Sequence, residues 1–291
     1  MSIIEKLFEK DVSKTVKKDN FDKHSDGSSS VDKQNISRSV EPDHGNDKHE
    51  KTTNVQINYE RLKSFGFLTP DIMNITLAEQ YRRIKQPILL NAFHDGIEGL
   101  RNGNLVMVTS SLPSEGKTFS SFNLAMSVAN EFNHSVLYVD ADVAKQTITK
   151  CLGLTEKAGL TDYLVNENLG LSDLIIGTDI VNLKILPAGG QNDRITELWA
   201  SSKMQALLSE MSQRYNDRLI IFDAPPVLSD SSASILSRIV GQVILVIEAE
   251  KTPQHVLEET LNIIKDSQYI GLILNKSNQK QSSEYGYYAH V

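Results

Sequence analysis

Hydrophobic and polar positions divide the chain into segments of very different character. Residues 11–56 are rich in Lys, Asp, Ser, Asn and His and contain few large apolar side chains. Such a segment cannot bury enough apolar surface to offset the entropy lost on ordering, so we expect a disordered linker. From residue 57 onward apolar runs recur, which predicts a globular domain over residues 57–277 and a polar tail over residues 278–291.

The first ten residues have a pattern of their own. Residues 1–10 place Ile3, Ile4, Leu7 and Phe8 on one face of a helix. This pattern is typical of a short amphipathic helix that docks on a partner or on a bilayer surface. Because isolated helices of this length are marginal in water, a frayed terminus with incidental apolar residues is an equal alternative.

Within the domain, short apolar runs alternate with stretches of helical spacing. The predicted strands are 105–109, 136–140, 183–186, 219–222, 243–248 and 270–274. The predicted helices are 76–90, 119–132, 203–215, 231–239 and 255–266, and Pro87 predicts a break or kink in the first. Continuous apolar strands are typical of parallel sheets covered on both faces, so we predict a doubly wound, mostly parallel α/β fold.

A polar loop follows the first predicted strand: Ser111-Leu112-Pro113-Ser114-Glu115-Gly116-Lys117-Thr118, with Phe119 next. A strand, a loop ending in Gly-Lys-Thr and a helix form the architecture of a phosphate-binding P-loop, so we assign these nine residues to nucleotide binding. Gly116 permits close backbone approach, Lys117 would reach the β- and γ-phosphates, and Thr118 would ligate Mg²⁺. Ser111 stands where the strict P-loop pattern has glycine. The alternative to a P-loop is a polar turn that caps a core helix.

Two further apolar runs end in carboxylates. Asp223 follows one of them, as in a Walker B motif, and would hold Mg²⁺ directly or through water. Asp140 and Asp142 end the run that follows the P-loop helix, so we expect their strand beside the P-loop strand and both carboxylates near the γ-phosphate. One can accept a proton while the other holds the metal. A turn-forming Asp pair is the alternative. The motifs predict ATP and Mg²⁺ binding in a P-loop domain of the deviant Walker type, and they leave the acceptor, water or a hydroxyl, open.

Charge and cysteine usage narrow the classes of function. The net charge is −7 with both signs mixed along the chain, which argues against nucleic acid as a partner. The single cysteine, Cys151, excludes an intramolecular disulfide and suits a reducing compartment. No apolar run approaches the roughly 18 residues that span a bilayer, and the N-terminus is too short and too charged for a signal peptide. We therefore expect a cytoplasmic protein.

The tail carries three tyrosines, Tyr285, Tyr287 and Tyr288, within the last seven residues, after a polar run. Together with the segments 111–118, 136–142 and 220–226, this cluster resembles the bacterial tyrosine kinases (BY-kinases) of exopolysaccharide export. The chain is most similar to their stand-alone cytoplasmic type, which acts in capsule and exopolysaccharide chain-length control. The resemblance covers about residues 75–291.

The resemblance implies an ATP-dependent protein-tyrosine autokinase that phosphorylates its own tail tyrosines in trans and regulates polysaccharide polymerisation or export. By the same resemblance Asp140 would accept the tyrosine proton, Asp142 and Asp223 would organise Mg²⁺ with Thr118, and Lys117 would stabilise the transferring phosphoryl group. Asn275 would contact adenine.

The resemblance also implies partners. These are a transmembrane activator of the polysaccharide co-polymerase type, a cognate tyrosine phosphatase, and other copies of the chain in a ring when unphosphorylated. Through the activator the protein would lie at the inner face of the plasma membrane. Glu79, Arg82 and Lys85 resemble the family's ExxRxxR oligomerisation motif, with lysine in place of the last arginine.

Two other functions stay open at this point. A ParA/MinD-type ATPase switch shares the three motifs, but its usual loop carries an extra lysine, and no lysine lies between Val106 and Gly116. A weakly active regulatory subunit, phosphorylated by another kinase, would also need a tyrosine tail. A further departure from the family follows the paired aspartates, where Arg and Pro are usual and Val143-Ala144-Lys145-Gln146 stand here.

Overall fold

The computed structural model describes residues 54–71, 74–94 and 96–277. The helix expected at residues 1–10, almost all of the linker and the tyrosine-bearing tail lie outside the described residues, so those expectations stay predictions. Within the described ranges, no helix combines the length and the apolar character needed to cross a membrane.

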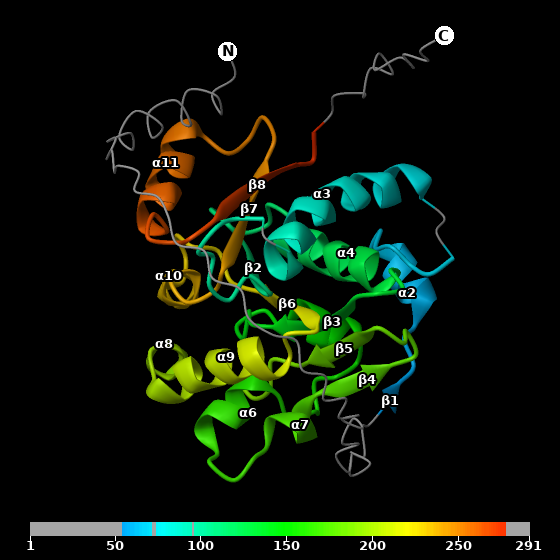
Figure 1. Ribbon diagram of the computed structural model, residues 1–291, viewed down its shortest axis with the longest axis vertical. Coiled ribbons are helices and arrows are strands. Elements are labelled where there is room, and N and C mark those ends of the chain that lie inside the picture. Colours follow the sequence, from blue (N-terminus) through cyan, green and yellow to red (C-terminus); the bar gives the residue numbers. More distant parts are fainter. Residues whose placement is uncertain (1–53, 72–73, 95, 278–291) are drawn as a thin grey trace, which may run out of the picture. The chain divides into compact units, whose positions relative to one another are not determined.

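An eight-stranded sheet forms the centre of the fold, in the order β1-β4-β5-β3-β6-β2-β7-β8 (Figure 1). Neighbouring strands run parallel, except that β4 and β5 are antiparallel. The bounds are Asn54–Val55 (β1), Leu105–Ser110 (β2), Ser135–Asp140 (β3), Ile176–Thr178 (β4), Leu183–Leu186 (β5), Arg218–Asp223 (β6), Gln242–Glu248 (β7) and Ile270–Asn275 (β8). The six predicted strands and the mostly parallel α/β fold are confirmed.

The helices connect these strands and cover the sheet. Their bounds are Tyr59–Ser64 (α2), Ile75–Phe93 (α3), Lys117–Ala129 (α4), Thr147–Cys151 (α5), Leu160–Val165 (α6), Leu171–Leu174 (α7), Ile195–Trp199 (α8), Ser202–Arg214 (α9), Ser231–Ser237 (α10) and Gln254–Ile263 (α11). The five predicted helices are α3, α4, α9, α10 and α11. The other five have four to six residues each, too short for a helical period to show in the sequence.

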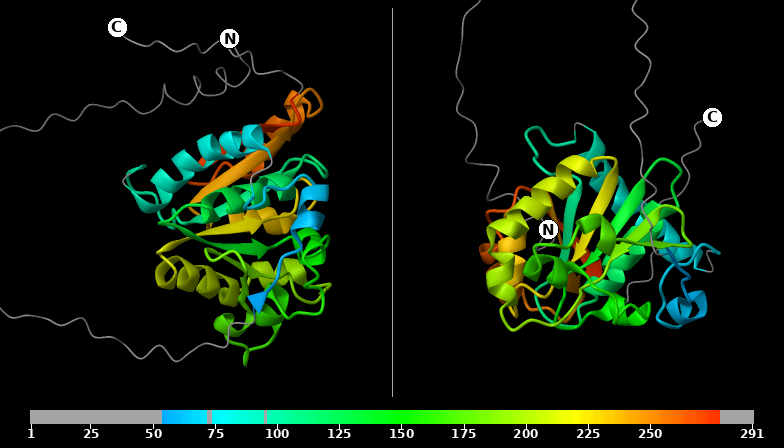
Figure 2. Two further views of the ribbon diagram at one scale, coloured as in Figure 1. Left: turned by 90° about the vertical axis from the view of Figure 1, so that its right-hand side faces the viewer. Right: turned by 90° about the horizontal axis from the view of Figure 1, so that it is seen from below.

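Two apolar cores sandwich the sheet because side chains alternate along each strand. On β2, Leu105 and Met107 enter the core that contains residues of α6, α8, α9, α10 and α11. Val106 and Val108 enter the core on the other face, with residues of α2, α3 and α4. Figure 2 shows this layering from two further directions. All four side chains are buried to 0% exposure, which explains why this strand reads as a continuous apolar run.

The order of the strands corrects one expectation. β3 does not lie beside the P-loop strand β2, because β6 is inserted between them and pairs with both. Nothing in the sequence near β3 specifies this order, which is set by where the later strand β6 finds its place in the sheet. The carboxylate at the end of β6 therefore lies between the P-loop and the carboxylates that follow β3.

Two local features of the fold bear on the expectations from the sequence. The predicted break at Pro87 does not occur, since α3 runs unbroken across it, and a kink there stays a prediction. Pro87 and Arg83, whose carbonyl loses its helical donor, are both exposed, so water can satisfy that carbonyl. Asn54–Val55, which the predicted linker includes, form the edge strand β1. A two-residue strand has no alternation that the sequence could show.

Candidate active site

The phosphate-binding loop lies where the strand–loop–helix pattern predicts, between β2 and α4. Gly116 is the N-cap of α4 with a left-handed φ of 101°, and no side chain caps the helix. The first N–H groups of α4 are therefore available to an anion. A Cβ added at Gly116 would collide with the side-chain amide of Asn275. Glycine is needed here for its φ and for this close approach.

Strand register brings the carboxylates together at the same edge of the sheet. Asp140 at the end of β3 and Asp223 at the end of β6 are direct partners in the parallel pairing, and the N–H of Ala141 donates to the carbonyl of Asp223 at 3.0 Å. Asp142 follows two residues after β3. The side chains of Asp140, Asp142 and Asp223 are all buried, and they lie at or just beyond the carboxyl ends of β3 and β6, where ligands bind in open α/β sheets.

Lys117 lies at the centre of this cluster. Its Nζ is 2.6 Å from Asp142 Oδ2 and 3.7 Å from Asp223 Oδ1, with side-chain exposures of 5% for Lys117, 3% for Asp142 and 0% for Asp223. Burial opposes the charge on Lys117, but the negative charges of Asp223 and Asp142 outweigh it and raise the pKa of the lysine. A buried cation paired this way can exchange a carboxylate for a phosphate.

Thr118 connects the loop to β6. Its hydroxyl donates to Asp223 Oδ2 at 2.7 Å, and Lys117 Nζ donates to the same hydroxyl oxygen at 3.3 Å. Burial is the main cause that raises the pKa of Asp223, and the charge of Lys117 and the hydrogen bond from Thr118 oppose the shift. Since the Thr118 proton is directed to Asp223, a lone pair of its oxygen remains for a cation.

Asp140 is the most enclosed of the three acids. Its Oδ2 accepts the N–H of Thr149 at 2.9 Å and the hydroxyl of Thr149 at 2.7 Å. Its Oδ1 has no hydrogen-bond partner among the residues that the structure describes. Burial, and then the negative charge of Asp223, raise the pKa of Asp140 to about 7, while the bonds from Thr149 act to lower it. A carboxylate with this pKa can take up or release a proton near neutral pH.

The donor set fits a hard cation whose coordination is completed by a ligand. In the described part of the chain, no three His, Cys, Asp or Glu side chains are placed to hold a metal by themselves. Mg²⁺ is usually bound by one or two carboxylates together with phosphate and water oxygens. The Thr118 hydroxyl and the Oδ1 atom of Asp223, which lacks a hydrogen-bond partner among the described residues, supply oxygen ligands of the right kind.

Other predicted nucleotide-binding residues have neighbours of their own. The ring of Phe119 is half-buried and stacks on Phe67, with centroids 5.7 Å apart. The amide of Asn275 donates to the carbonyl of Glu115 at 2.9 Å. Asn275 therefore lies against the phosphate-binding loop, and a contact with adenine stays a prediction.

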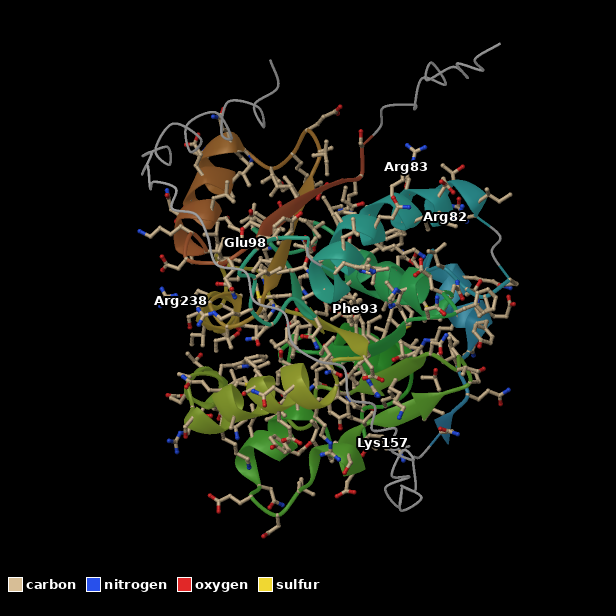
Figure 3. The ribbon with its side chains drawn as sticks, viewed as in Figure 1. Arg82, Arg83, Phe93, Glu98, Lys157 and Arg238 are labelled. Carbon is tan, nitrogen blue, oxygen red and sulfur yellow. The ribbon has the colours of Figure 1, made fainter. Side chains whose placement is uncertain are left out.

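The three charged residues on α3 differ in exposure, although Arg82 and Lys85 line the same hollow between α3 and the end of α4. Glu79 and Arg82 form an exposed ion pair of 3.1 Å, and Figure 3 shows Arg82 on the outer side of α3. Lys85 is buried, with its Nζ 2.7 Å from Glu131 and 2.8 Å from the carbonyl of Ser127 at the end of α4. Lys85 is therefore occupied within its own chain, and the part of these three residues in an interface between copies stays a prediction.

Two residues that contact the site were not predicted. Thr149 orients Asp140, and the Tyr138 hydroxyl lies 3.0 Å from the hydroxyl of Ser121 in the fully buried layer beneath the P-loop helix. Burial is the main cause that raises the pKa of Tyr138, with the charges of Asp223 and Asp140 adding to it. Both residues look like ordinary core or helix residues in the sequence, and only the three-dimensional contacts reveal them.

Known proteins resemble this chain in sequence and in fold. Residues 113–277, more than half of the chain, match the protein family described as AAA domain. CapB of Staphylococcus aureus is 29% identical over 215 residues, which make up 73% of this chain and 90% of that protein. Tyrosine-protein kinase YwqD of Bacillus subtilis is 32% identical over 214 residues, 72% of this chain and 86% of that protein.

A solved structure extends the match to three dimensions. The crystal structure of the VpsO kinase domain has a TM-score of 0.58 and 32% sequence identity, covering 69% of this chain and 96% of that one. The fold and the site define an α/β domain of the AAA family with a P-loop. Within that class the chain belongs to the bacterial tyrosine-protein kinases, as its resemblance to BY-kinases indicates.

Proposed function

We propose that the chain is an ATP-dependent protein-tyrosine autokinase. It would transfer the γ-phosphoryl group of ATP to Tyr285, Tyr287 and Tyr288 in the tail of another copy. The observation that carries the proposal is the buried Lys117 between Asp142 and Asp223, at the N-terminus of a helix whose amides are uncapped. This arrangement supplies the positive charge that phosphoryl transfer needs, in a site that excludes water.

The residues of the loop would divide the work on the nucleotide. Backbone N–H groups of the loop and of the first turn of α4 would surround the phosphates, except at Pro113, which has no N–H, and at Leu112, whose N–H is donated to Glu115. Lys117 would leave Asp142 to follow the transferring phosphoryl group. Thr118, Asp142 and Asp223 would hold Mg²⁺, which when bound supplies positive charge between the β- and γ-phosphates. Asp223 is already bonded to the Thr118 hydroxyl, so it would orient that ligand as well as attract the cation.

Asp140 would accept the proton of the attacking tyrosine hydroxyl. Its Oδ2 is fixed by Thr149, and its Oδ1 is free of hydrogen bonds from the described residues. A pKa of about 7 places its proton affinity close to the pH of the cell interior, where a general base is most effective. The O–H bond of the tyrosine would break as its oxygen bonds to phosphorus, and ADP would leave.

The decisive experiment measures the intact mass of the full chain after incubation with ATP and Mg²⁺, followed by mapping of modified residues. A gain of phosphate on the tail tyrosines supports the proposal, and Lys117→Met should abolish it. Replacement of all three tail tyrosines by phenylalanine is the matched control, because it leaves the described fold untouched. Release of inorganic phosphate without protein labelling would overturn the proposal in favour of an ATPase switch.

The family resemblance extends the proposal to the setting in which the kinase works. A transmembrane activator of the polysaccharide co-polymerase type would recruit the chain to the inner face of the plasma membrane. Copies would form a ring when unphosphorylated, a cognate phosphatase would reverse the modification, and the cycle would control polysaccharide polymerisation or export. Co-purification of the chain with an activator encoded beside it, and loss of polymer length control in a Lys117→Met strain, test this setting.

A further inference from the structure

A buried carboxylate in the phosphate-binding loop is hydrogen-bonded both to the loop itself and to a turn outside it. Glu115 is only 2% exposed. Its Oε2 accepts the N–H of Leu112 at 2.7 Å, and its Oε1 accepts the hydroxyl of Thr252 in a short hydrogen bond. Thr252 lies in the turn between β7 and α11. One side chain therefore ties the loop to itself and to a neighbouring turn.

The backbone of the same loop is held by β8. Lys276 Nζ donates to the carbonyl of Ser114 at 2.7 Å and pairs with Glu248 Oε2 at 3.0 Å. The amide of Asn275 donates to the carbonyl of Glu115. Two loop carbonyls are therefore held by donors from the end of β8 and the residue after it.

Three non-glycine residues in and beside the loop have left-handed backbone conformations. Ser114, Glu250 and Lys276 have φ values of 72°, 61° and 57°. Left-handed conformations cost non-glycine residues about 1–3 kcal/mol each and persist where the surroundings fix them. The three strained residues are held in place by the hydrogen bonds and ion pair that Glu115, Thr252 and Lys276 make.

The chemistry of the contacts explains why an acid stands beside a site for phosphate. Leu112 offers an N–H, and Thr252 offers its hydroxyl proton because the Thr252 oxygen already accepts the N–H of Glu248 at 3.2 Å. Both partners are donors, so the side chain at 115 must accept twice. A carboxylate does this, whereas glutamine would present one acceptor and one donor.

We propose that Glu115 is a positioning residue for ATP binding and that Thr252 is its partner; we call this pair the Glu115–Thr252 clasp. The clasp holds the loop in the curvature that presents its N–H groups to the phosphates, and it acts through the backbone without touching the reacting groups. The inference rests on the proposed binding of ATP at this loop.

The test measures the Kd for Mg·ATP by isothermal titration calorimetry with the full chain. Thr252→Val removes the hydroxyl and should raise Kd about tenfold, and Glu115→Gln should raise it comparably. Thr252→Ser keeps the hydroxyl and should stay within about twofold of wild type. In autophosphorylation assays Thr252→Val should raise KM for ATP far more than it lowers kcat, which loss of structure alone would not do.

Thr260→Val is the matched control, because Thr260 on α11 is buried and its hydroxyl donates within its own helix, to the carbonyl of Val256 at 2.8 Å. If Thr252→Val binds ATP as wild type does, or Thr260→Val weakens binding equally, the clasp is overturned. Should Thr252→Val fail to fold, Glu115→Gln against wild type decides in the same way. If the wild-type chain does not bind ATP, the proposed function and the clasp are both overturned. If the wild-type chain binds ATP and Thr252→Val binds it equally well, only the clasp is overturned.

Discussion

The hydroxyl and the backbone N–H of Thr149 both donate to one oxygen of Asp140, Oδ2, at 2.7 and 2.9 Å. Thr149 lies on α5, directly after the strand that carries the acid. The same hydroxyl oxygen accepts the N–H of Ala188 at 3.2 Å, so its proton is committed to Asp140. This fixed donor leaves Oδ1 as the atom of Asp140 that can serve the reaction.

Thr149→Val should therefore slow catalysis without weakening nucleotide binding. Loss of the hydroxyl removes one of two bonds that stabilise the ionised carboxylate, and it frees Asp140 to rotate. We expect kcat for autophosphorylation to fall about tenfold, with the Kd for ATP within about twofold of wild type. Thr149→Ser, which keeps the donor, should restore most of the rate. An equal loss in both variants would show that the methyl packing matters, not the hydrogen bond.

The raised pKa of Asp140 predicts how stability depends on pH in the protein free of nucleotide and metal. Its pKa rises from an ordinary 3.8 to about 7 on folding, so the folded state binds more protons between these values. Stability from this group is fully present below about pH 4 and is lost as pH rises through 7.

Asp140→Asn removes this dependence. Above pH 7 the variant should be more stable than wild type by roughly 2–4 kcal/mol, and the difference should shrink as pH falls toward 4. Urea unfolding of both proteins at pH 5, 6, 7 and 8 measures it. A difference that stays constant across this range would contradict the assigned titration.

Glycine is needed at position 116 for two reasons, its left-handed φ and the close approach of Asn275, and substitutions can separate them. Gly116→Ala meets both the left-handed φ of 101° and the collision with Asn275. We expect the Kd for ATP to rise more than about tenfold, since each cause distorts the loop. Asn275→Ala in the same chain removes the collision and leaves the backbone strain. Calorimetry on the single and double variants should show partial recovery, whereas no recovery would assign the whole effect to φ.

The strands could be predicted because residues such as Leu105 and Ile220 lie in continuous apolar runs that a sheet covered on both faces requires. The P-loop and its three acids could be predicted because a polar loop ending in Gly-Lys-Thr and two apolar runs ending in carboxylates are local patterns in the sequence. The insertion of β6 beside β2 could not be predicted, because strand order depends on contacts between segments far apart in the sequence. The role of Thr149 was hidden for the same reason.

The burial of Lys85, next to the exposed Glu79 and Arg82, follows from helix geometry and could have been read from the sequence spacing. A step of three residues falls about 60° short of a full helical turn, so Lys85 lies about 120° around α3 from Glu79. Glu79 and Arg82 therefore face solvent while Lys85 turns toward α4. A stripe at i, i+3 and i+6 drifts around a helix, and the third residue need not share the surface of the first.

The last prediction separates stability from assembly on this helix. Lys85→Met leaves Glu131 without its buried partner and the Ser127 carbonyl, near the C-terminus of α4, without its donor. We expect the free energy of unfolding to fall by about 1–3 kcal/mol. Arg82→Ala breaks an exposed pair and should change stability by less than about 0.5 kcal/mol. Urea unfolding measures both, and light scattering of the same samples reports assembly.

If copies associate through the exposed face of α3, Arg82→Ala alters the mass distribution at unchanged stability, whereas Lys85→Arg, which keeps the charge, leaves it as in wild type. Equal destabilisation by Arg82→Ala and Lys85→Met would contradict the different environments of the two cations.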